Sequence, residues 1–261
     1  MPKNTCRTPG RSLLIRYCLA AALAAPVTDA AAADGRKKGL IVPGEPVSMP
    51  PLVRYYKSFI DDNDADAFVQ NVLARYTEGS LIRLLDTNEA DTRRAAVLSL
   101  GLIGGSAANT SVGERMKDDD PVVRSLAENA LWGIWFRSDS SENNQELSTV
   151  RNLLSEDKID EAFTRVNLLI EKAPRFAEAW NQRAIIHFTR GDWEKSAADC
   201  RKVVEMNPYH YGAISGMAQC YIRSDQPRQA IEAFRLLVRI QPHNTAAAAA
   251  IEALEHERRR P

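Results

Sequence analysis

The apolar residues of this chain recur with the three- and four-residue spacing of helix faces. Trp180 and Ala184 lie four residues apart, which places both on one face of a predicted helix. In the segment over 245–260 the apolar residues again share one face, while the charged residues can stay in water. Alanine and leucine are plentiful and aromatic residues make up only 7% of the chain. This mixture favours helices, so the pattern predicts a largely helical protein.

A longer pattern has a period of 34 residues. Pro174, Pro208 and Pro242 stand 34 residues apart, and each ends a stretch that predicts two helices. In this register a small residue recurs at one position and a turn residue at another: Ala162, Ser196 and Ala230, then Asp157, Gly191 and Asp225. Proline cannot continue a helix, so each proline marks the end of a repeat. The sequence therefore predicts three helical hairpins, over about 143–176, 177–210 and 211–244.

This period, with its large and small residues at fixed positions, resembles the tetratricopeptide repeat. The middle window matches best, through Trp180, Ala184, Gly191, Trp193 and Pro208, and departs at Cys200, where the family usually has an aromatic residue. The resemblance implies an array of stacked hairpins with a terminal cap. It also implies that the first helix of each hairpin lines a concave groove for a peptide.

A second period, of 31 residues, precedes the first. It aligns Arg93 with Arg124 and predicts helices over 90–104 and 120–135. Asp120 before Pro121 is a typical helix start, with a capping side chain followed by proline at the first helical position. The pattern resembles HEAT repeats, and a degenerate copy predicts two further helices near 52–60 and 64–76.

The N-terminal residues resemble a secretory signal peptide. A basic segment is followed by the apolar run YCLAAALAAPV and by small residues, so we expect cleavage between Ala33 and Asp34. Eleven apolar residues are too few to cross a bilayer, which needs about 20, and the alternative of a short anchor stays open. We expect export to the periplasm or envelope of a bacterium, without stable membrane insertion after removal of the signal.

These elements together predict an all-α fold, an alpha-solenoid of helical hairpins. The expected organisation is a signal peptide over 1–33, a linker over 34–50, HEAT-like repeats over 51–136, a linker over 137–145, tetratricopeptide repeats over 146–244 and a capping helix over 245–261. The second linker is either a hinge or a loop within one continuous array.

Charge and chemistry narrow the function. Lys plus Arg and Asp plus Glu both number 34, a balance that argues against a nucleic-acid partner. No zinc-helix or C-x-x-C spacing occurs. The acidic run at Asp62, Asp64 and Asp66 lacks the glycine and final glutamate of a calcium loop. We therefore predict no catalytic residue, no metal and no cofactor, and a protein that is not an enzyme.

Several residues have two interpretations. His210 and His243 follow the repeat-ending prolines and are expected in surface turns. Trp132 and Trp135 form either an exposed aromatic patch or, as we favour, a buried junction between the two arrays. Cys200 and Cys220 lie on adjacent predicted helices, where free buried thiols are commoner than the disulfide that export would permit.

The tetratricopeptide resemblance also implies which residues face the groove. They are Asn144, Leu147, Arg151, Glu178, Asn181, Ile185, Phe188, Gln219, Ile222 and Arg223. Their mixture of apolar side chains, amides and charges suits a protein or peptide partner. We therefore expect a non-enzymatic interaction scaffold or assembly factor. The alternatives are a non-catalytic or regulatory subunit of an envelope enzyme complex and a cell-wall or membrane-surface binding protein.

Overall fold

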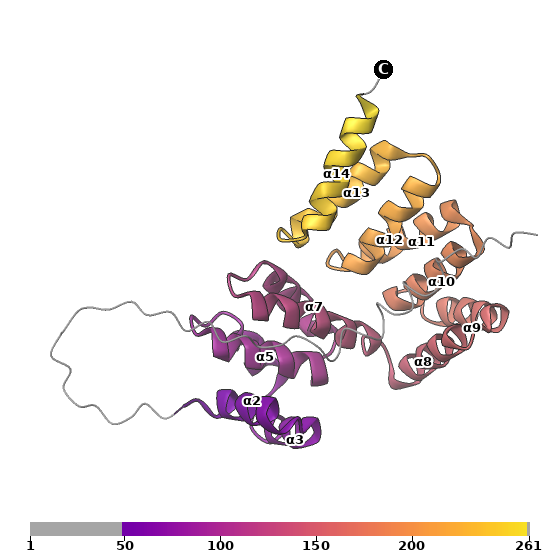
Figure 1. Ribbon diagram of the computed structural model, residues 1–261. Helices are drawn as coiled ribbons and strands as arrows, with labels where there is room; N and C mark the ends of the chain where they lie inside the picture. The colour runs from indigo at the N-terminus through magenta and orange to yellow at the C-terminus, as the bar shows by residue number, and fades with distance from the viewer. Residues whose placement is uncertain (1–48, 260–261) are drawn as a thin grey trace, which may run out of the picture. The chain divides into compact units, whose positions relative to one another are not determined.

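The structure is a computed structural model that describes residues 49–259. The predicted signal peptide and nearly all of the predicted first linker lie outside the described residues. Every regular element over 49–259 is a helix, and this part of the chain contains no strand. The predicted all-α fold, a succession of helical hairpins, is confirmed (Figure 1). Over the same residues, no helix has the length and apolar character required to cross a membrane.

The helices fall into two sequential groups. The first comprises α2 (Pro51–Asp62), α3 (Ala65–Leu73), α4 (Glu78–Leu84), α5 (Ala90–Ile103), α6 (Asn109–Glu114) and α7 (Pro121–Phe136), with short 3-10 turns at Ser106–Ala108 and Arg115–Lys117. The second comprises α8 (Ser141–Ser155), α9 (Ile159–Lys172), α10 (Ala177–Arg190), α11 (Trp193–Met206), α12 (Tyr211–Arg223), α13 (Pro227–Ile240) and α14 (Thr245–Arg258). The described residues from Pro51 onward form one compact unit.

The 34-residue register corresponds to three hairpins, α8–α9, α10–α11 and α12–α13. The residues predicted at the turn between the paired helices, Asp157, Gly191 and Asp225, all have positive φ, at 60°, 82° and 55°. That backbone conformation is readily adopted by glycine and tolerated by aspartate. The recurring small residues are buried where the paired helices meet, and the Ser196 hydroxyl donates a hydrogen bond to the Ala184 carbonyl at 2.8 Å.

The 31-residue register reproduces a hydrogen-bond pattern. The Arg93 Nη1 donates to the carbonyls of Thr87 and Asn88, and the Arg124 Nη1 donates to those of Asp118 and Asp119. Each arginine therefore ties the start of its helix to the preceding turn. At α7, the Asp120 carboxylate accepts from the backbone N–H groups of Val122 and Val123, so the predicted helix start is confirmed.

The connection between the two groups is shorter than the predicted linker over 137–145. Helix α8 already begins at Ser141, because the Ser140 side chain caps it by accepting from the Asn143 N–H at 3.2 Å. The Asn143 amide in turn donates to Asp139 at 2.6 Å. The irregular segment is thus 137–140, and the polar residues over 141–145 form the first turn of a helix.

Candidate functional site

The candidate site is the face formed by the first helices of the three hairpins, α8, α10 and α12. The ten residues predicted to line this face differ in how exposed they are in the structure. Leu147, Glu178 and Asn181 are buried, the last two at 1% and 4% exposure, so they do not lie on an open surface. Asn144 is half-buried, and its amide binds the backbone of Asp139. The other six are half-buried or exposed: Arg151, Ile185, Phe188, Gln219, Ile222 and Arg223.

Helix α7 covers part of this face. The Trp135 ring stacks on His210, with ring centroids 3.9 Å apart and planes 14° from parallel. Trp132 lies against the start of α12, where a Cβ added to Gly212 would meet its ring at 2.8 Å. Trp135 is buried and Trp132 is half-buried. The tryptophans therefore form the predicted junction between the two groups of helices, and the alternative of an exposed aromatic patch is wrong.

A buried polar network lies beneath the tryptophans. His210 and Glu178 are fully enclosed, with 2.9 Å between Nε2 and Oε2. The His210 Nδ1 accepts from the Ala213 N–H at 3.0 Å, so the ring hydrogen is on Nε2 and is donated to Glu178. The other Glu178 oxygen accepts from the amides of Asn181 and Gln182 at 2.9 and 2.7 Å.

The expected surface location of His210 is therefore wrong. The residue does follow a repeat-ending proline, but a carboxylate and an aromatic face both satisfy its ring in the interior, which makes burial favourable. Glu178 is 32 residues away in the sequence and Trp135 lies in another group of helices. The period of 34 residues carries no signal for these contacts. His243, the other histidine expected in a surface turn, is exposed.

A second set of contacts joins α6 to the turn before α12. The Trp135 Nε1 donates to Asn109 at 2.7 Å, and the Asn109 amide donates to Asn207 at 2.9 Å. The Tyr209 hydroxyl donates to Glu114, and a Cβ at Gly113 would meet the Tyr209 ring at 2.5 Å. The hydrogen bond to Glu114 is the main reason that the pKa of Tyr209 is raised to about 12.

Further contacts connect α7 with the third hairpin. The Tyr211 hydroxyl donates to the Glu128 carbonyl at 3.0 Å, and the Gln241 amide donates to the Glu128 carboxylate at 2.8 Å. Burial raises the pKa of Glu128, against the opposing effect of the Gln241 hydrogen bond. Helix α7 is thus fixed to the hairpin array at both its middle and its C-terminal end.

The part of the face that α7 leaves accessible lies toward the C-terminal ends of the first helices. We call it the open strip and define it as Arg151, Leu154, Ile185, Phe188, Ile222 and Arg223. Ile222 is 39% exposed, although it is a large apolar residue. Two aromatic rings border the strip, since Arg151 lies over Phe136 at 3.7 Å and Arg223 over Trp193 at 5.9 Å. Phe188 packs edge-on against Trp193. The strip thus combines apolar side chains with two guanidinium groups.

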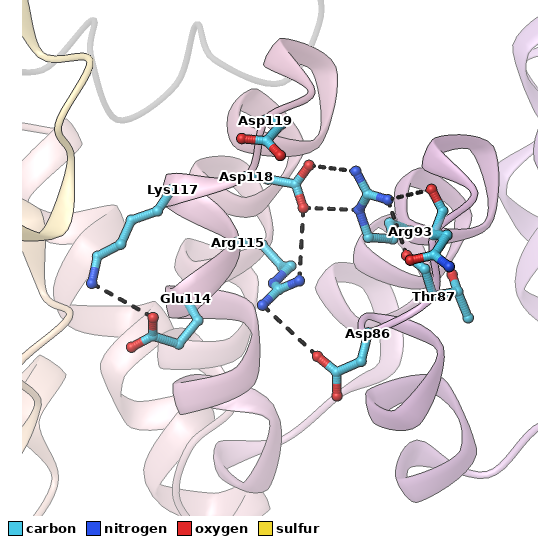
Figure 2. Close-up of a pocket in the computed structure, with 9 residues that line it drawn as sticks. Asp86, Thr87, Arg93, Glu114, Arg115, Lys117, Asp118 and Asp119 are labelled. Atoms are coloured by element: carbon cyan, nitrogen blue, oxygen red, sulfur yellow. Dashed lines mark hydrogen bonds and ion pairs between the residues drawn. The ribbon is translucent and has the colours of Figure 1, made fainter.

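A polar pocket of about 520 Å³ lies elsewhere, among the N-terminal helices (Figure 2). The arginine and lysine side chains that line it form ion pairs with its aspartate and glutamate side chains. Figure 2 shows Arg93 facing the two oxygens of Asp118, Arg115 between Asp118 and Asp86, and Lys117 beside Glu114. Within 49–259, no group of three or more His, Cys, Asp or Glu residues is placed to hold a metal ion. The ion pairs of this pocket thus join α5 and the turn before it to the turn that precedes α7.

Comparison with known proteins finds similarity to tetratricopeptide repeats over part of the chain. The tetratricopeptide repeat model matches residues 187–254. A TPR repeat-containing protein of Rhizobium etli is 28% identical over 131 residues, which are 50% of this chain and 64% of that protein. Anaphase-promoting complex subunit 3 of Schizosaccharomyces pombe is 28% identical over 85 residues, which are 33% of this chain and 13% of that one. The chain thus spans less than two thirds of either relative.

Two solved structures are similar at low identity. The first TPR of Spaghetti (RPAP3), bound to the HSP90 peptide SRMEEVD, has a TM-score of 0.43 at 17% identity and covers 46% of this chain and 94% of its own. YrrB, described as a TPR protein with an unusual peptide-binding site, has a TM-score of 0.39 at 17% identity and covers 76% and 97%. The matches to the family model and the relatives support a tetratricopeptide repeat protein, a class that is generally made of non-catalytic interaction modules.

Proposed function

We propose that this protein is an interaction scaffold of a bacterial cell envelope that binds a peptide or protein segment on the open strip. The observation that carries the proposal is the accessible set of apolar side chains on the first helices, which α7 leaves uncovered. Ile222 alone is 39% exposed, and the neighbouring Phe188 and Ile185 are half-buried. Apolar residues gathered on one face, rather than scattered singly, are typical of a binding surface.

The proposal includes the location of the protein in the cell and the organisation of its chain into repeats. The basic, apolar and small residues of the N-terminal 33 positions support export. The 31-residue hydrogen-bond pattern of Arg93 and Arg124 supports HEAT-like repeats over 51–136. In this proposal those repeats hold α7 against the hairpins, and the hairpins bind the partner.

Site-specific photo-crosslinking tests the binding surface. A photo-reactive residue is placed at Ile222 in the full chain, in the organism that encodes it. The matched control carries the same residue at Leu168, which is 60% exposed but lies on α9, outside the strip. We expect a discrete protein adduct from Ile222 that is missing from Leu168. Identical adducts from both positions, or none from Ile222, would contradict the proposal.

Export is tested separately by the intact mass of the protein recovered from the envelope fraction. A mass that begins at Asp34 supports the predicted cleavage. A mass that begins at Met1 in a cytoplasmic fraction would leave the binding surface in place and remove the envelope from the proposal.

A further inference from the structure

We propose that the open strip selects an extended peptide segment with two acidic side chains about six residues apart and apolar residues between them. Arg151 and Arg223 bind the two acids, while Ile185, Phe188 and Ile222 take the apolar residues. The inference rests on the proposed function and specifies its ligand, which is a segment within a protein and requires no free chain end.

The first argument is the state of the two guanidinium groups. Arg183 and Arg190 of α10 are paired with Asp199 and Asp160. Over residues 49–259, by contrast, Arg151 and Arg223 take part in no ion pair, and their guanidinium groups lie over the rings of Phe136 and Trp193. A guanidinium that lies on an aromatic ring keeps its N–H groups available in its own plane. These groups can bind a carboxylate through two parallel hydrogen bonds.

The second argument is charge complementarity along the strip. Its six residues include two cations and no anion. Glu178, the nearest acid on α10 toward its N-terminus, is fully enclosed and bound by three donors. Asp157 and Asp225 belong to the turns beyond the helix ends. An acidic ligand thus gains two opposite charges, and a basic ligand meets two like charges, which disfavours it.

The third argument is spacing. Arg151 belongs to α8 and Arg223 to α12, and both helices pack against α10. Axes of packed helices lie about 8–10 Å apart, so two steps cover about 18 Å. An extended chain rises about 3.3 Å per residue and spans that distance with about six residues. Because side chains alternate along a strand, every second residue between the acids can point at the apolar part of the strip.

The width of the strip favours an extended ligand over a helical one. Near the start of α12 the face is already covered by α7, through Trp132 at Gly212 and Trp135 at His210. A helix with side chains is about 10–12 Å across, whereas an extended chain takes about 5 Å. A second helix lying beside α7 would need the width that α7 occupies.

Selection from a random peptide library displayed on phage tests the inference with the protein covering 34–261. We expect the enriched peptides to carry two acids about six residues apart that flank apolar residues. A synthetic peptide of the enriched sequence should bind about fivefold more weakly to Arg151→Glu and to Arg223→Glu, and also more weakly at high salt. Arg228→Glu is the matched control, since Arg228 is exposed on α13, outside the strip. Its binding should equal that of the unaltered protein.

The double variant Arg151→Glu with Arg223→Glu gives the sharpest outcome, because it should select basic peptides instead. Its folding is checked by circular dichroism. Neutral apolar peptides that are lost with Ile222→Glu but unaffected by the arginine variants would overturn this inference and leave the proposed function standing. If no peptide binds the strip in any selection, both fail.

Discussion

The indole of Trp135 lies flat on the imidazole of His210, with 3.9 Å between the ring centroids. This contact joins the end of α7 to the turn that precedes α12. Two hydrogen bonds set the tautomer of this histidine, because Nδ1 accepts from the Ala213 N–H and Nε2 donates to the Glu178 carboxylate. The junction is thus a stacked aromatic pair above a buried carboxylate, and its loss should affect the whole array.

We expect Trp135→Ala to reduce the free energy of unfolding by about 3–5 kcal/mol, the usual cost of truncating a buried tryptophan. The indole also loses its hydrogen bond to Asn109. Urea unfolding followed by circular dichroism measures the change. Trp193→Ala serves as the control, because Trp193 is half-buried and should cost less. An equal loss in both variants would show that stacking of Trp135 on His210 adds nothing to the free energy of unfolding beyond the packing of an ordinary half-buried tryptophan.

A methyl group at Gly212 should be destabilising. The added Cβ would meet the Trp132 ring at 2.8 Å, so the ring or α12 must shift, at a cost of about 1–3 kcal/mol. Gly79→Ala is a matched substitution inside α4, where the nearest atom lies 3.9 Å from the added Cβ. There alanine should be neutral or stabilising by up to about 1 kcal/mol. Thermal unfolding of the two variants should therefore move in opposite directions or differ clearly in size.

The Tyr209–Glu114 contact should make the protein sensitive to alkaline pH. The pKa of Tyr209 is raised to about 12 in the folded protein, while an unfolded tyrosine titrates near 10. The folded state therefore holds the phenolic proton more tightly, and its stability falls as pH rises from about 10 towards 12. Absorbance at 295 nm should show one fewer late-titrating tyrosine in Tyr209→Phe. The same variant should lose less stability than the unaltered protein over that pH range.

At acid pH the ion pairs of the N-terminal helices should weaken. The hydrogen bond from Arg94 lowers the pKa of Asp120, aided by the N–H groups at the start of α7 and opposed by burial. The stabilisation is present above the unfolded value of about 3.9 and is lost as pH falls through the folded value. Urea unfolding at pH 6 and pH 3 should show a smaller loss for Asp120→Asn than for the unaltered protein.

Asp119→Asn is the control for this acid dependence, since Asp119 is exposed in the same turn. It should lose as much stability as the unaltered protein between the two pH values. If Asp120→Asn shows the full acid loss as well, the Arg94 pair does not contribute to it.

Periodicity made the hairpins predictable from the sequence. The prolines, the small residues and the turn residues repeat every 34 positions, and helix bounds follow directly from such local signals. The start of α7 was equally clear, because Asp120 and Pro121 are adjacent and act within one turn. Packing of the tryptophan pair at the junction was predictable as well, since large aromatic residues at a junction are more often packed than exposed.

Which of the predicted site residues are buried and which are accessible could not be predicted from the sequence. Glu178 and Asn181 occupy positions that face a groove in the repeat pattern, yet both are buried, and Glu178 pairs with His210, on which Trp135 of α7 stacks. No period relates α7 to α10 or α12, so nothing in either register indicates this contact. Gly113 and Gly212, which admit the Tyr209 and Trp132 rings, carry no repeat signature either. Long-range packing therefore decided which predicted residues stayed accessible.

Helix α7 contacts all three hairpins, and its length therefore limits how many hairpins the array can hold. Phe136 lies under Arg151 of the first hairpin, Trp135 stacks on His210 after the second, and Glu128 binds Tyr211 and Gln241 of the third. These anchors span nine residues of one helix, from Glu128 to Phe136, a rise of about 12 Å. Repeat arrays commonly gain or lose units because each unit contacts its neighbours alone. Here a fourth hairpin inserted between these contacts would separate them by more than the length of α7. The length of α7 therefore limits the number of hairpins between its contacts to three.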